Sequence, residues 1–146
     1  MKAERRAEAQ WKGNLVNGQG KFQLGSGAVG EIPVTWASRT ERADGKTSPE
    51  ELIAAAHASC YAMAFSHTLT QEGHPPESLT VNAVCILEDV AGQLKITTMT
   101  LNVRGKVPGI DEATFVQIAQ KAEQGCPVSN VLRGGLQIHL NAHLEL

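Results

Sequence analysis

Alternating apolar and polar residues predict strands in several parts of the chain. Residues of about 9–36 form short β-like runs separated by glycines, which predicts a small antiparallel sheet with tight turns. Two further runs, 79–87 and 97–103, each place apolar side chains on one face, and Gly92 marks the turn between them. Apolar and polar residues also alternate over 136–145, which predicts another half-buried strand.

A long helix is predicted to begin at Ser48. Ser48 can cap the helix, Pro49 suits its first position and Glu51 completes a capping box. We expect the helix to run to about Glu72 and to end before Gly73. Its middle is apolar on nearly every side, so several neighbouring elements must cover it.

A second helix is predicted between an N-cap at Asp111 and a C-cap at Gly125. A short helical turn then begins at Cys126, with Pro127 at its first position. Residues 38–47 are polar and are expected to form a loop. The resulting order, β-β-β-α-β-β-α-β, predicts an α+β fold.

Length and charge narrow the class of protein. The chain has 146 residues, which suits a single domain over residues 1–146, and 42% of them are hydrophobic. The formal net charge is −2 with no basic stripe, so nucleic acid is not an expected partner. No apolar run reaches the length of a membrane span, and the charged N-terminus leads into no signal-peptide core. We therefore expect a soluble, cytoplasmic protein without a membrane partner.

Three cysteines carry the candidate chemistry: Cys60, Cys85 and Cys126. An odd, small number in a cytosolic chain argues against a structural disulfide framework. Metal binding, thiol chemistry and plain packing remain open for them. Cys85 falls among the apolar residues of a predicted strand face, which indicates packing.

Cys60 needs a nearby positive charge if it is to be a nucleophile. It lies in the middle of the apolar helix, where burial alone raises the pKa of a thiol. Arg39 and Arg42 lie in the segment before the helix. Glu50 could hold one of these arginines over the thiol, or could simply stabilise the helix N-terminus through the helix dipole.

Cys126 and His57 leave other readings open. Cys126 could be the N-cap of a short turn, a position that lowers the pKa of a thiol. The spacing does not decide whether it meets Cys60. His57 lies one turn before Cys60, and such a pair suits a metal site, a base-activated thiol or simple packing.

Two cysteine motifs resemble those of the osmotically inducible protein C (OsmC) family. The first, TSPEELIAAAHASC, covers residues 47–60 and ends at Cys60. The second comprises VPGID at 107–111 and AEQGCPVSNVL at 122–132. The run WASR at 36–39 matches the place where OsmC proteins carry their active-site arginine, although Thr40 stands where an aromatic residue is common. The resemblance extends over nearly the whole chain and keeps the same order.

The resemblance implies an OsmC-like α+β fold. Antiparallel sheets would wrap around two long central helices in an intertwined homodimer, with two active sites at the subunit interface. A dimer of this kind agrees with the apolar surface of the predicted long helix, which is too extensive for one small domain to bury alone.

The resemblance also implies a thiol-dependent hydroperoxide reductase. Arg39, held by Glu50, would keep Cys60 ionised, and Cys60 would attack an organic hydroperoxide to form a sulfenic acid. Cys126 would then form a disulfide with Cys60, and an external thiol or dithiol would reduce it. This chemistry needs no metal and no prosthetic group.

Two other functions remain as alternatives. The chain could be a metal-binding protein that uses Cys60, Cys126 and His57, or a non-catalytic dimeric ligand carrier whose cysteines are only packed. Metal analysis and a count of thiols before and after treatment with a hydroperoxide distinguish these alternatives from a peroxidase.

Overall fold

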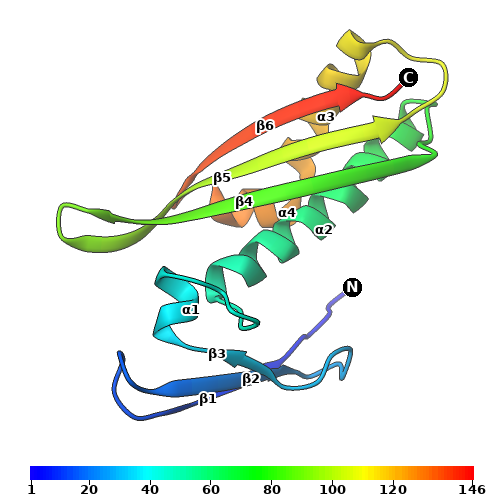
Figure 1. Ribbon diagram of the computed structural model, residues 1–146. Helices are drawn as coiled ribbons and strands as arrows, with labels where there is room; N and C mark the ends of the chain where they lie inside the picture. The colour runs from blue at the N-terminus through cyan, green and yellow to red at the C-terminus, as the bar shows by residue number, and fades with distance from the viewer. The chain divides into compact units, whose positions relative to one another are not determined.

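The computed structural model describes all residues, 1–146, and they form two compact units, Met1–Leu52 and Ile53–Leu146 (Figure 1). The first unit contains a sheet of three strands, β1 (Ala7–Lys12), β2 (Gln19–Leu24) and β3 (Ile32–Val34), in the order β1-β2-β3. Both pairings are antiparallel. The prediction of a small antiparallel sheet is therefore confirmed.

A short helix, α1 (Trp36–Thr40), follows β3, and the prediction of a loop from residue 38 is wrong there. Thr35 and Ser38 form a capping box, in which each side chain accepts a hydrogen bond from the backbone N–H of the other. Ser38 also donates to the carbonyl of Thr47. These bonds fix Arg39 on a regular turn of helix.

The long helix α2 spans Pro49–Gln71, as predicted. The Ser48 hydroxyl accepts the backbone N–H of Glu51, and Gly73 ends the helix region in the left-handed conformation, with φ at 86°. The fully buried residues of α2 recur every four positions, at His57, Tyr61, Phe65 and Leu69.

Within this chain only one stripe of α2 is buried. Met63 on another side of the helix is 69% exposed, and Ala55 and Ala56 are exposed as well. The apolar composition of α2 predicts that neighbouring elements cover the helix on several sides. Within this chain they cover it on one side only.

The second unit contains a sheet with the order β4-β5-β6. Strands β4 (Ser78–Val90) and β5 (Gln93–Lys106) form an antiparallel hairpin. Its two turn residues, Ala91 and Gly92, have φ angles of 53° and 83°, which is typical of a tight two-residue hairpin turn.

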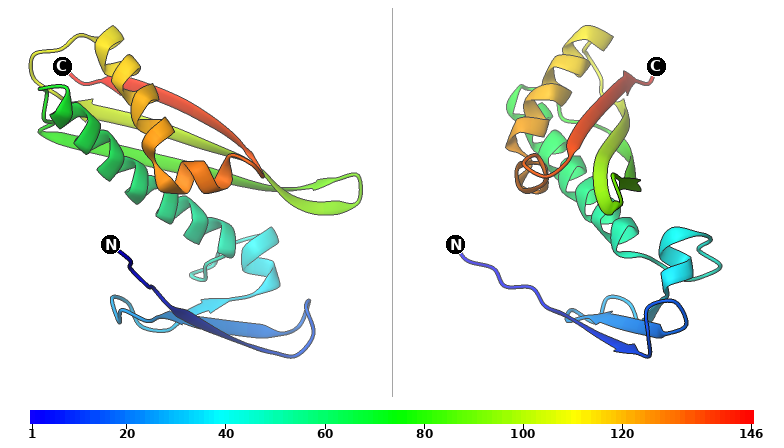
Figure 2. Two further views of the ribbon diagram at one scale, coloured as in Figure 1. Left: turned by 180° about the vertical axis from the view of Figure 1, so that it is seen from behind. Right: turned by 90° about the vertical axis from the view of Figure 1, so that its left-hand side faces the viewer.

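Strand β6 (Gln137–Leu144) runs parallel to β5, so the prediction of antiparallel sheets is wrong at this pairing. The chain between them passes through α3 (Glu112–Gly125) and α4 (Pro127–Leu132), and such a crossover brings the next strand back in the same direction. Figure 2 shows α3, α4 and residues 53–71 of α2 on the same face of this sheet.

Aromatic rings join α2 to α3 in the core of the second unit. The ring centroids of Tyr61 and Phe65 lie 5.7 Å apart, and those of Phe65 and Phe115 lie 5.0 Å apart. The Tyr61 hydroxyl donates to the carbonyl of Ala119 at 2.8 Å. Helix α3 begins at the predicted cap, because the Asp111 side chain accepts the N–H of Thr114. None of the helices combines the length and apolar character needed to cross a lipid bilayer.

Candidate active site

The structure brings Cys60 and Cys126 together although 66 positions separate them, and their Sγ atoms lie 3.4 Å apart. Cys60 lies in the middle of α2, and Cys126 is the N-cap of α4. Cys126 is fully buried, whereas Cys60 is partly exposed. Both are thiols rather than a disulfide. The distance is about 1.3 Å longer than an S–S bond, so a small movement would join them.

The third cysteine, Cys85, lies on strand β4 and not on the helices that carry this thiol pair. It faces Met99 across the β4–β5 hairpin and packs against the core, as predicted from its strand pattern.

The surroundings of Cys60 within the second unit favour the neutral thiol. Burial raises its pKa, and the neighbouring Cys126 raises it further. The backbone N–H of Val128, in the first turn of α4, donates to the sulfur and lowers the pKa. Because the net change is upward, a reactive thiolate at neutral pH requires a positive charge in addition to this N–H.

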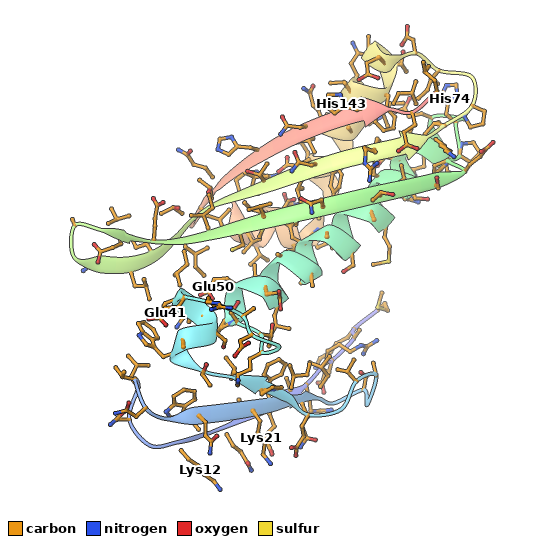
Figure 3. The ribbon with its side chains drawn as sticks, viewed as in Figure 1. Lys12, Lys21, Glu41, Glu50, His74 and His143 are labelled. Atoms are coloured by element: carbon orange, nitrogen blue, oxygen red, sulfur yellow. The ribbon has the colours of Figure 1, made fainter.

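Arg39 and Glu50 form the ion pair that the sequence suggested. Nε of Arg39 donates to Oε1 of Glu50 at 2.9 Å, and Nη2 lies 2.8 Å from the same oxygen in the ion pair. The Glu50 side chain is only 7% exposed, and its second oxygen is buried without a hydrogen-bond partner. Glu50 lies at the beginning of α2, next to α1 (Figure 3). Arg42, the other arginine considered, is exposed.

A buried polar contact lies one turn from the thiol pair and was missed from the sequence. Nε2 of His57 lies 2.6 Å from Oγ of Ser129, and both side chains are fully buried. Burial lowers the pKa of His57; Glu123 raises it and Arg133 lowers it, each to a smaller extent. Both residues lie within the two cysteine motifs, and Ser129 follows Cys126 by the same three positions by which Cys60 follows His57, but neither signal pairs the two side chains.

A second polar group holds the junction of α3 and α4, and it too was missed. Nη2 of Arg133 donates to the side-chain oxygen Oε1 and the backbone oxygen of Glu123, and Nη1 donates to Oδ1 of Asn130. The carbonyl of Glu123 also accepts the N–H of Cys126. The Glu123 side chain is 9% exposed. Glu123 falls within the second cysteine motif at 122–132, but the motif does not indicate its partner.

The side chains form no group of three or more His, Cys, Asp or Glu residues arranged to hold a metal ion. Cys60, Cys126 and His57, the residues of the alternative metal site, form no such group, and Nε2 of His57 contacts Ser129. The arrangement of two adjacent thiols suits redox chemistry better.

Comparison with known proteins identifies the family of this chain. Residues 42–141 match the family described as OsmC-like protein. The chain is 39% identical over 138 residues to peroxiredoxin OsmC of Escherichia coli, covering 94% of this chain and 96% of the relative. It is 28% identical over 129 residues to organic hydroperoxide resistance protein OhrA of Bacillus subtilis, covering 87% and 90%. A crystal structure of an organic hydroperoxide resistance protein from Elizabethkingia anophelis covers 99% of this chain and 100% of its own, with a TM-score of 0.76 and 22% identity. The chain belongs to the OsmC-like protein family.

Proposed function

We propose that this protein is a thiol-dependent peroxidase that reduces organic hydroperoxides, and hydrogen peroxide more weakly. The observation that carries the proposal is the 3.4 Å separation of the Cys60 and Cys126 sulfurs. Relatives named for peroxiredoxin activity and for organic hydroperoxide resistance support it. We expect organic hydroperoxides to be preferred over hydrogen peroxide, because burial of the apolar surface of their alkyl group is favourable.

In the first step the Cys60 thiolate attacks the outer oxygen of the hydroperoxide. An S–O bond forms as the O–O bond breaks, and the alkoxide leaves and takes a proton to become an alcohol. Cys60 is oxidised to a sulfenic acid. Cys60 suits this role better than Cys126 because it is the partly exposed member of the pair.

In the second step the Cys126 sulfur attacks the sulfenic acid of Cys60. The S–O bond breaks, a disulfide forms, and hydroxide leaves with the thiol proton as water. An external thiol or dithiol then reduces the disulfide by exchange, which returns both cysteines to thiols. The cycle uses only cysteine sulfur and requires no metal or prosthetic group.

We assign to Arg39 the positive charge that Cys60 needs. Its ion pair with Glu50 joins Nε and Nη2 to one carboxylate oxygen. The nearly buried Glu50 carboxylate would fix the plane of the guanidinium, since such pairs restrict orientation strongly.

We also propose that the protein is a homodimer. The exposed apolar surface of α2, formed by Ala55, Ala56 and Met63, supports this proposal. Small side chains on this surface would let a second helix approach closely. Sedimentation of the protein and of Met63→Glu tests it, and a dimer that the substitution converts to a monomer is the expected result.

The reaction is tested by counting thiols after one equivalent of an organic hydroperoxide. The wild-type protein should lose two thiols and release one equivalent of alcohol. Cys60→Ser should consume no peroxide, whereas Cys126→Ser should react once, keep a sulfenic acid and stop cycling. Wild-type turnover in either variant would rule out this assignment, and a protein that loses no thiols would be a carrier.

A further inference from the structure

The thiol of Cys126 and the hydroxyl of Ser129, both buried, contact α2 on the same side. Cys126 and Ser129 lie three positions apart on α4, and His57 and Cys60 lie three positions apart on α2. Residues at this spacing lie on one face of a helix. The two helices therefore meet at two neighbouring contacts, sulfur to sulfur and imidazole to hydroxyl.

We propose that His57 and Ser129 form a latch that holds α4 against α2, so that Cys126 can reach the oxidised Cys60. This inference rests on the peroxidase function proposed above. His57 and Ser129 act as positioning residues, because neither needs to touch the peroxide. Their role concerns the second step, in which the disulfide forms.

The burial and geometry of this contact resist separation of α4 from α2. The Nε2 to Oγ distance of 2.6 Å is short, and both side chains have zero exposure, so water does not compete for the contact. Nδ1 of His57 is buried and has no partner, so separation of the helices would leave both ring nitrogens unsatisfied. The hydrogen bond therefore penalises any movement of α4 that carries Cys126 away from Cys60.

A role in stability alone explains this contact less well. Replacing both members of a buried hydrogen-bonded pair by apolar groups of similar shape is often nearly neutral for stability. An apolar pair would hold the helices together without fixing their register. The hydrogen bond fixes Nε2 of His57 opposite Oγ of Ser129. Because the two thiols lie one turn away on the same helices, it also keeps their sulfurs opposite each other.

The latch matters because the distance between the sulfurs must shorten. The Sγ atoms must move from 3.4 Å to an S–S bond of about 2.05 Å as the S–O bond of the sulfenic acid breaks. Formation of the disulfide, here called closure, is slow if α4 is displaced from α2 most of the time. Loss of the latch should slow closure about tenfold, as expected for one buried hydrogen bond, and leave the attack on peroxide unchanged.

Single-turnover oxidation of the full chain by an organic hydroperoxide separates these two steps. Sulfenic acid is trapped with dimedone, and disulfide is measured by mass spectrometry after acid quenching. The variants are Ser129→Ala, Ser129→Thr and the double variant His57→Leu with Ser129→Ala. Val131→Ala is the matched control on α4, because Val131 is 81% exposed.

The expected result is a step-specific loss. Ser129→Ala and the double variant should form sulfenic acid at the wild-type rate but close the disulfide about tenfold more slowly, so that sulfenic acid accumulates. Ser129→Thr, which keeps the hydroxyl, should restore closure, and Val131→Ala should behave as wild type. The double variant keeps the test valid if Ser129→Ala does not fold.

Two results would overturn the inference. One is wild-type closure in the folded double variant, and the other is an equal slowing of both steps. Failure of the peroxidase proposal looks different, because the wild-type protein itself would then form neither sulfenic acid nor disulfide.

Discussion

The ion pair between Arg39 and Glu50 allows a direct test by Glu50→Gln. The substitution keeps the shape of the side chain and removes its charge. A hydrogen bond to a charged group contributes about 1.5–3 kcal/mol. The Arg39 side chain is 31% exposed, so water screens the pair and the lower end, about 1.5 kcal/mol, applies. If this energy holds the guanidinium in its working orientation, its loss corresponds to about a tenfold slower reaction.

The assay is the second-order rate at which an organic hydroperoxide oxidises Cys60 at neutral pH. Glu51→Gln is the matched control, because it removes the same charge from the same first turn of α2. The Glu51 carboxylate accepts a hydrogen bond from Thr47, and no ion pair joins it to Arg39. Glu51→Gln should stay within about twofold of wild type, since any change there reflects only the helix dipole and a weaker, uncharged contact with Thr47.

Equal rates for Glu50→Gln and Glu51→Gln would refute the reasoning. Glu50 would then act only as a favourable charge at the N-terminus of α2, which is the simpler reading of its position. A tenfold loss confined to Glu50→Gln would instead support orientation of the guanidinium as the source of the effect.

Two further predictions concern ionisation and packing. In Arg39→Gln the oxidation rate of Cys60 should rise with pH through a higher pKa than in the wild type, because the thiolate reacts and an opposite charge has been removed. Overlapping pH profiles of the two proteins would exclude Arg39 as the stabilising charge. Gly105→Ala should lower the free energy of unfolding in urea by about 1–3 kcal/mol, because its Cβ would lie 2.7 Å from Cδ2 of Leu79 and close to a phenylalanine ring. Gly134→Ala, whose Cβ meets nothing within 4 Å, is the control.

Much of the fold could be predicted because its signals are local. The cap at Ser48, the proline at the start of α2 and the glycine after its end define that helix within a few residues. Helix α1 was missed because five residues give no helical periodicity, and its cap depends on a reciprocal pair of side chains. The parallel direction of β6 was missed because strand direction depends on the path of the whole crossover.

The site divides in a similar way. The pairing of Arg39 with Glu50 could be proposed because both fall in recognisable motifs. The contact between the two thiols depends on how α2 and α4 pack, which spacing along the chain does not contain. Ser129 was missed for the same reason, since a serine three residues after a cysteine has no meaning until another helix supplies its partner.

The parallel pairing of β5 and β6 has a consequence for how the molecule assembles. Hydrogen bonds between these strands can form only after the crossover through α3 and α4 has closed, and long crossovers of this kind form slowly because of their loop entropy. The same crossover carries Cys126, so the two sulfurs should become neighbours in the same cooperative event that completes the sheet. During folding, Cys60 should therefore pass through a period in which it is solitary and open to oxidation without a resolving thiol beside it.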